Sequence, residues 1–163
     1  MLPAHTAPLD TLELRALTRG MSEQTELWRP RVRHEPDQRT YELLMHDEHV
    51  MAWLICWMDD HDTGFHDHDL SAGSVTVVEG SVREERLRVG RPALSRTFVA
   101  GETFDFVASD IHRVAHAGGV PAVTLHAYSP PLWRMGAYVV EDSGALRRHS
   151  VSYAEELRPL KAA

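Results

Sequence analysis

The sequence has one cysteine, no long apolar run and fewer basic than acidic side chains. Cys56 cannot form an internal disulfide, and its apolar neighbours in "LICW" predict a buried core thiol. The longest apolar run, residues 50–58, is far shorter than the roughly 20 residues that a membrane helix needs. The 17 Lys and Arg against 24 Asp and Glu give a formal net charge of −7. This charge argues against a nucleic-acid groove, which needs clustered cations.

The N-terminus has no basic segment followed by a long apolar run, so the sequence shows no secretion signal. We therefore expect a cytoplasmic protein that binds neither membranes nor nucleic acid, and we expect a monomer. A chain of 163 residues is long enough to bury a core without disulfides. The length predicts a single domain spanning residues 1–163.

Residues 1–30 differ from the rest and predict a short helical extension. The stretch "LDTLELRALTRG" has a capping residue at Asp10 or Thr11, leucines at helical spacing, and Gly20 as a stop. A second short helix is expected from Ser22, closed by a proline. We interpret these helices as an N-terminal extension of the main domain.

From about Arg39 onward the patterns are those of β-strands. Strands are predicted over 50–58, 74–79, 81–89, 97–100, 102–107, 121–131, 137–142 and 146–151. Two turns, at Gly80 and Gly101, predict hairpins. Short strands with regular turn signals favour an all-β sandwich or a closed barrel, which we place within residues 39–150.

The unusual feature is the number of histidines, which is eleven. In "GFHDHDLSAG", His66 and His68 would point to the same face of a strand, because successive side chains alternate. Such a pair can chelate a divalent metal, although on an exposed strand it can equally be two solvated side chains. A firm site needs a third ligand. The candidates in the second half are His112, His116, His126 and His149.

The order and spacing of these histidines resemble the two motifs of the cupins. The first cupin motif ends in a His-x-His pair, an acidic ligand and a glycine, and this chain supplies His66, His68 and Gly80. The second motif joins a glycine to a histidine, supplied here by Gly101 and His112. The resemblance implies a cupin jelly-roll β-barrel, preceded here by the helical extension, with His112 as the third metal ligand.

The chain departs from the first cupin motif at two positions, and in the second motif Val107, Ser109 and His116 replace Pro, Gly and Asn. Asp60 stands where the first motif begins with glycine, and Gly73 stands where cupins carry the acidic ligand. Three neutral imidazoles without a carboxylate leave a divalent metal with its full charge. Such a site favours an anionic substrate ligand such as a thiolate.

Five segments, "WLICW", "HDHDLSAG", "GSVREERL", "IHRV" and "PAVTLHAYSPPL", resemble the cysteine dioxygenase (thiol dioxygenase) family of cupins, bacterial type. The likeness runs from about Arg39 to Val140. It implies that Fe(II) binds the three histidines and that a small-molecule thiol and O2 yield a sulfinic acid. Some members crosslink a cysteine to the active-site tyrosine. Gly73 stands at that position here, so we predict no crosslink.

The family also has a Ser-His-Tyr relay beside the iron, which corresponds here to Thr124, His126 and Tyr128. These residues lie at i, i+2 and i+4, so they share one face of a strand. A hydroxyl, an imidazole and a phenol in line can form a hydrogen-bonded chain that orients O2 or the substrate. Without the resemblance, an inward polar pair with Tyr128 packed on the core explains the pattern equally well.

The family anchors the substrate carboxylate with an arginine on an early strand. Arg39 matches that position after a one-residue shift, and Thr40 matches it without the shift. Arg33, Arg113 and Arg134 are further candidates. A planar guanidinium suits a carboxylate because it can bind both oxygens.

The identity of the thiol stays open at this point. Cysteine, 3-mercaptopropionate and ergothioneine are all compatible, and Trp53, Trp57 and Trp133 could line a larger pocket, with core packing the alternative for the first two. Two other classes of function remain. One is a cupin metalloenzyme that uses another metal and a non-thiol substrate, and the other is a non-catalytic sensor that binds a small molecule without turnover.

Overall fold

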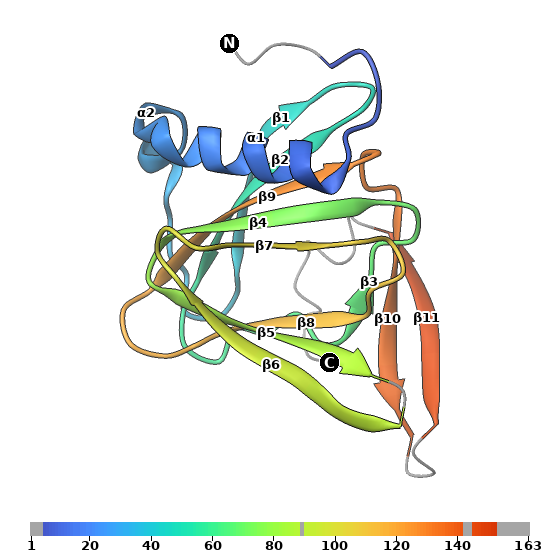
Figure 1. The fold of residues 1–163 in the computed structure, drawn as a ribbon. Coiled ribbons are helices and arrows are strands. Elements are labelled where there is room, and N and C mark those ends of the chain that lie inside the picture. The colour runs from blue at the N-terminus through green and yellow to red at the C-terminus, as the bar shows by residue number, and fades with distance from the viewer. Residues whose placement is uncertain (1–4, 89, 142–144, 153–163) are drawn as a thin grey trace.

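Two antiparallel β-sheets face each other, and two helices cover the outer face of one of them (Figure 1). This computed structural model describes residues 5–88, 90–141 and 145–152. The predicted strand ends at Val89 and Asp142, and the ends of the predicted domain, lie outside the described residues.

The first sheet carries the helices and contributes the relay residues. Its strands, in spatial order, are β1 (Thr40–His46), β2 (Met51–Trp57), β9 (Ala122–Ser129), β4 (Ala72–Glu79) and β7 (Thr103–Phe106). All four pairings are antiparallel.

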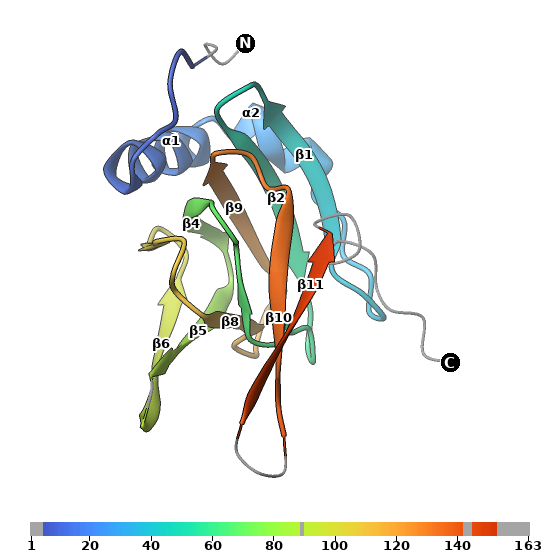
Figure 2. The ribbon, with the colours of Figure 1, turned by 90° about the vertical axis from the view of Figure 1, so that its right-hand side faces the viewer.

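The second sheet contributes two of the clustered histidines. Its strands, in spatial order, are β11 (Leu146–Ser152), β10 (Arg134–Val140), β3 (His66–Asp67), β8 (His112–His116), β5 (Ser81–Arg88) and β6 (Arg91–Val99). The long β10–β11 hairpin, seen from the front in Figure 2, borders the short strand β3, which is labelled beside β10 in Figure 1.

The predicted hairpins at Gly80 and Gly101 are corners between the two sheets. The strands before and after each turn belong to different sheets, so they do not pair with each other. Gly80 has φ +66, and a Cβ there would lie 2.7 Å from the carbonyl oxygen of Pro121. The chain thus turns tightly against β9 and passes to the facing sheet. Repeated crossing of this kind gives the jelly-roll barrel, which confirms the predicted all-β fold class.

Asp10, one of the two predicted capping residues, is the N-cap of helix α1 (Thr11–Glu23). The Asp10 side chain accepts from the backbone N–H of Glu13, and the Glu13 side chain accepts from that of Asp10, both at 2.9 Å. The predicted stop at Gly20 is wrong, because Gly20 lacks the positive φ of a helix-ending glycine and Met21 is buried against the sheet.

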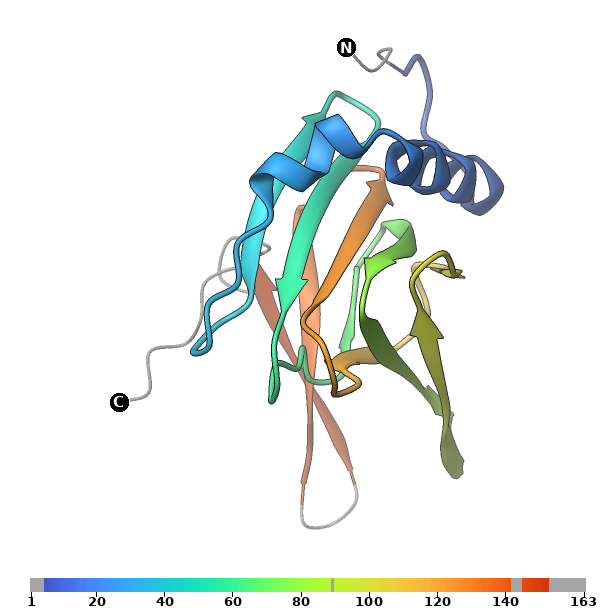
Figure 3. The same cartoon turned by 90° about the vertical axis from the view of Figure 1, so that its left-hand side faces the viewer.

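The second helix, α2 (Thr25–Trp28), starts later than the predicted Ser22, because α1 occupies that residue. A 3-10 turn, Arg29–Arg31, follows it. Both helices lie outside the first sheet (Figure 3). Leu14 and Trp28 are buried there, and full burial of a side chain such as Leu14 contributes roughly 1.5–3 kcal/mol.

Strands β2 and β9 are apolar on both faces because both faces are covered. On β2, Ile55 and Trp57 face the space between the sheets, whereas Leu54 and Cys56 face the helices. The free thiol of Cys56 is buried, as predicted. The alternation on β9 sends its polar residues toward the interior of the barrel, where a site can form.

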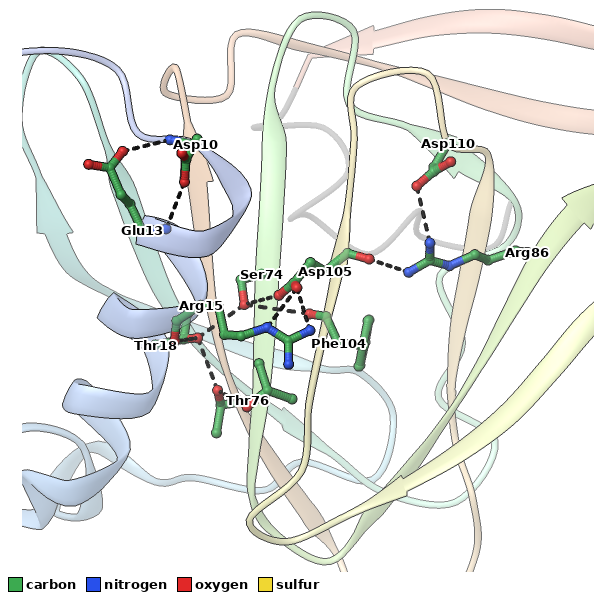
Figure 4. Close-up of polar contacts among 11 residues, drawn as sticks. Asp10, Glu13, Arg15, Thr18, Ser74, Thr76, Arg86, Phe104, Asp105 and Asp110 are labelled. Carbon is green, nitrogen blue, oxygen red and sulfur yellow. Dashed lines mark hydrogen bonds and ion pairs between the residues drawn. The ribbon is translucent and has the colours of Figure 1, made fainter.

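A polar network joins α1 to the first sheet (Figure 4). The Thr18 and Ser74 hydroxyls are 3.2 Å apart, and Thr76 donates to Thr18 at 3.0 Å. Arg15 donates to Asp105 through Nε at 2.8 Å. These contacts satisfy polar groups that would otherwise be buried without partners, and they fix the helix on the sheet.

Candidate metal centre and active site

Three buried histidines converge inside the barrel. His66 lies on β3, His68 follows that strand, and His112 begins β8 directly opposite His66. One ring nitrogen from each lies within 4.8 Å of the others. The sequence pattern therefore selected residues that the fold brings together.

The hydrogen bonds of the three rings leave nitrogens available for a metal. His66 Nδ1 lies 3.0 Å from the Gly64 carbonyl oxygen, and His112 Nδ1 lies 2.9 Å from Glu84 Oε1. Within the described part of the chain, both ring nitrogens of His68 are buried without a partner. A buried polar atom left unpaired costs about 1–3 kcal/mol. A bound metal ion would give one of the two His68 nitrogens a partner, so the residues fit a metal site.

Burial keeps these imidazoles neutral. It lowers the pKa of His66 to about 4, and it lowers the pKa values of His68 and His112 well below the ordinary histidine value. Like-charge repulsion from a protonated neighbouring histidine would lower the pKa values of His68 and His112 further. A neutral imidazole has the free lone pair that a metal ligand needs.

The position of the missing acidic ligand is filled by an aromatic ring. A Cβ on Gly73 would overlap the ring of Phe106. That ring stacks on His68 with centroids 4.4 Å apart, and it lies 4.5 Å from the ring of His112. The packing therefore leaves no room at residue 73 for a fourth ligand, or for a cysteine next to Tyr128, its partner across the strands.

The three relay residues form a continuous chain on the interior face of β9. Thr124 Oγ1 lies 2.8 Å from His126 Nε2, and His126 Nδ1 lies 3.0 Å from the Tyr128 hydroxyl. Trp57 Nε1 donates to Thr124 Oγ1 at 2.8 Å. The side chains are buried, so this chain is shielded from bulk water.

A small cavity connects the relay to the histidine cluster. Its volume is about 40 Å³, and its lining includes His66, His112, His126, Tyr128 and Arg39. The rest of the lining is Tyr41, Trp53, Ile55, Trp57, Thr63, Val114, Leu132 and Met135. The cavity thus combines two histidines of the cluster with one arginine in a largely apolar wall.

Arg39 precedes β1, and its guanidinium lies 5.5 Å from the centre of the Tyr41 ring and 5.4 Å from that of Trp57. Of the alternative arginines, Arg33 is exposed, and Arg113 pairs with Asp62 outside the cavity. The fold therefore brings Arg39, and not these two, to the histidine cluster.

Several other candidates lie elsewhere. Arg134 and His149 are exposed, and His116 bonds to the Val120 carbonyl oxygen at 3.0 Å. Trp133, which could have lined a larger pocket, does not line this cavity and instead borders a separate hollow beside His68. It follows the paired prolines after β9, and 74% of it is exposed. Trp57, in contrast, both packs in the core and lines the cavity.

Sequence reasoning missed the contacts that hold the histidines in place. Asp67, between His66 and His68, accepts two bonds from Arg148, at 2.7 and 2.9 Å, and one from Tyr138 at 2.6 Å. Burial opposes ionisation of Asp67, but Arg148 and Tyr138 hold its pKa below the ordinary value. The available signal was strand alternation, which turns Asp67 away from the face of the histidines.

The barrel and its converging histidines give the chain the cupin fold with a candidate metal site. The family model for cysteine dioxygenase type I matches residues 5–141, and the chain belongs to that family. Membership indicates an oxidoreductase that acts on a small molecule. No curated protein sequence matches the chain.

Solved structures share the fold at low identity. A protein from Thermus thermophilus is 17% identical, with a TM-score of 0.57 over 63% of this chain and 93% of that one. A cupin superfamily protein from Desulfitobacterium hafniense is 13% identical, with a TM-score of 0.55 over 63% and 87%. These likenesses establish the architecture alone. Among the described residues, no helix has the length and apolar character to cross a membrane.

Proposed function

We propose that the protein is a non-haem Fe(II) thiol dioxygenase that converts a small thiol and O2 into a sulfinic acid. The observation that carries the proposal is one cavity that joins the histidine cluster, the Thr124–His126–Tyr128 relay and Arg39. Membership of the cysteine dioxygenase family supports the same reaction.

His66, His68 and His112 would hold the metal through neutral ring nitrogens. When bound, Fe(II) would supply open coordination positions and would lower the pKa of a coordinated thiol. The absence of a carboxylate among these residues favours an anionic sulfur ligand. Phe106, packed on His68 and His112, keeps the rings in place and excludes water from that side.

The size of the cavity favours a small substrate. Its volume of about 40 Å³ is far below the roughly 300–1,000 Å³ of sites for drug-sized ligands. Cysteine and 3-mercaptopropionate are small and carry a carboxylate that Arg39 can bind. Ergothioneine is bulkier, and Trp133 does not line the cavity and so does not make room for it.

The relay has a consistent direction of donation. Trp57 donates to Thr124, and we assign the next two contacts in the same direction, with Thr124 donating to His126 Nε2 and His126 Nδ1 donating to the Tyr128 oxygen. The Tyr128 O–H can then donate toward the reactants. In this arrangement Tyr128 orients the thiol or O2, and the apolar wall excludes water from the reacting sulfur.

The overall reaction balances as R–SH plus O2 giving R–SO2H. Two sulfur–oxygen bonds form, the bond within O2 breaks, the sulfur is oxidised and the oxygen is reduced. The thiol proton is retained on the sulfinic acid, so no further reductant is needed. Arg39 holds the substrate carboxylate throughout.

An oxygen-consumption screen tests the proposal. The protein is loaded anaerobically with Fe(II) and offered cysteine, 3-mercaptopropionate, cysteamine, mercaptosuccinate and ergothioneine. We expect turnover with a small thiol carboxylate, and a Tyr128→Phe variant should turn over roughly 10- to 100-fold more slowly, as loss of one strong hydrogen bond predicts. A loaded protein that binds a thiol without consuming O2 would support a sensor instead. Turnover of a non-thiol substrate with another metal would support the remaining alternative.

A further inference from the structure

Glu84 is a buried carboxyl group that the proposed reaction does not use directly. It lies on β5, its side chain is 5% exposed, and its Oε1 is 2.9 Å from His112 Nδ1. It faces the interior of the barrel, whereas its neighbour Glu85 pairs with Arg83 and Arg113. A buried carboxyl group is costly unless it is paired and hydrogen-bonded.

Arg86 holds Glu84 in place. Its Nε donates to the same Oε1 atom at 3.0 Å, and one of its other nitrogens donates to Asp110 at 3.2 Å. The remaining nitrogen donates to the carbonyl oxygen of Asp105, and both of these further bonds are visible in Figure 4. Three acceptors therefore fix the guanidinium, and the guanidinium fixes the carboxyl group against His112.

The contact determines which atom of His112 can bind a metal. A carboxylate paired with Arg86 can only accept, so we assign the proton of this contact to His112 Nδ1, which leaves the lone pair on Nε2 for coordination. The His112 ring thus lies between the Glu84 carboxylate and the proposed metal position. Gly73 and Phe106 leave no room for an acidic ligand at the usual cupin position. The Glu84 carboxylate therefore lies near the site without occupying a coordination position.

We infer that Glu84, held by Arg86, is a positioning residue that orients His112 and places a carboxylate beside its ring without occupying a coordination position. This inference rests on the proposed metal site. It does not depend on which substrate is oxidised.

Measurements of metal binding distinguish the effect of the Glu84 hydrogen bond from the effect of its charge. Glu84→Gln retains an oxygen acceptor for Nδ1–H but removes the charge, and Glu84→Ala removes both. Glu85→Gln is the matched control, one residue away on the other face of β5. Each protein is titrated with Co(II) against a chelator, and the optical spectrum of the bound ion is recorded. Circular dichroism of the metal-free proteins establishes that each variant is folded.

Loss of such a partner typically weakens metal binding 10- to 100-fold. We expect the Co(II) affinity of Glu84→Ala to fall by roughly that factor, with an altered Co(II) spectrum. The affinity of Glu84→Gln should fall by less, and that of Glu85→Gln should match the parent. Equal affinities and spectra for all four proteins would overturn the inference, as would a parent that binds no Co(II). If Glu84→Ala binds Co(II) more weakly but the Fe(II)-loaded parent oxidises no thiol, this inference stands and the proposed function is refuted. If Glu84→Ala does not fold, the comparison of Glu84→Gln with Glu85→Gln decides.

Discussion

The ring of Phe106 occupies the space into which a side chain at Gly73 would project. Gly73 has no positive φ, so it is glycine for reasons of space and not of backbone conformation. The ring in turn stacks on His68. One small residue and one large residue thus replace the acidic ligand of other cupins with an apolar wall.

We predict that Gly73→Ala destabilises the protein by about 1–3 kcal/mol, the usual cost of overpacking a core. In a Phe106→Leu background, which opens space beside residue 73, the same change should cost less. Chemical denaturation of the four proteins measures the difference as a double-mutant cycle. Additive effects would contradict a direct steric coupling of the two residues.

The bonds between Asp67 and Arg148 should support metal binding from outside the site. Arg148→Met removes two charge-assisted bonds to the residue between His66 and His68, and it should weaken metal affinity roughly tenfold and lower the melting temperature. Arg147→Met is the matched control, because Arg147 is exposed and pairs with Glu141. Isothermal titration with Co(II) makes the comparison. Equal affinities in the two variants would refute the role of Arg148.

Arg39 should contribute to substrate binding more than to chemistry. Arg39→Ala should raise KM for a thiol carboxylate roughly 10- to 100-fold, the value of a charge-assisted hydrogen bond, with a smaller change in kcat. For cysteamine, which has no carboxylate, KM should change little. Arg33→Ala, an exposed neighbour, serves as the control. An unchanged KM in Arg39→Ala would place the anchor elsewhere.

The hydroxyl of Thr124 should matter for turnover. Thr124→Val is nearly isosteric but cannot donate to His126, so kcat should fall, whereas Thr124→Ser should remain near the parent. Steady-state oxygen consumption gives both values, and metal affinity should be the same in all three proteins. Equal activity in the Val and Ser variants would make the hydroxyl dispensable.

The metal-free protein should lose stability as pH falls through the histidine range. Burial, with the nearby Arg39 and His66 charges, lowers the pKa of His126 to about 3. Unfolded His126 takes up a proton near pH 6.5, but the folded form resists until about pH 3. Stability therefore rises with pH across that window, by roughly 1.4 kcal/mol per pH unit for one proton.

His126→Gln should reduce the slope of stability against pH by up to the contribution of one proton. Thr124→Val, which keeps the histidine, should leave the slope unchanged. Denaturation curves at several pH values, with a chelator present, measure the slopes. A parent and His126→Gln with the same pH dependence would contradict a buried neutral His126.

The sequence predicted local features well and long-range pairings poorly. The spacing of His66, His68 and His112 marked a cluster that the fold assembles, and the alternation on β9 placed Thr124, His126 and Tyr128 on one face. Alternation shows which way a side chain points but not which strand lies beside it. The corner at Gly80 was therefore predicted as a hairpin.

The contacts that support the site join residues far apart in the chain. Glu84 meets His112, and Arg148 meets Asp67, across strands whose pairing the sequence did not specify. Each of these residues is also an ordinary surface type, and nothing in the local pattern separates it from its exposed neighbours. Only the packed barrel shows which of them are buried and paired.

We propose that this three-histidine protein places both atoms of O2 on the sulfur of a small thiol. The most direct test is to supply isotopically heavy dioxygen to the Fe(II)-loaded protein with its best thiol substrate, and to weigh the product by mass spectrometry. We predict a sulfinic acid that carries both heavy oxygen atoms. A disulfide product, or a sulfinic acid whose oxygen comes from water, would contradict it.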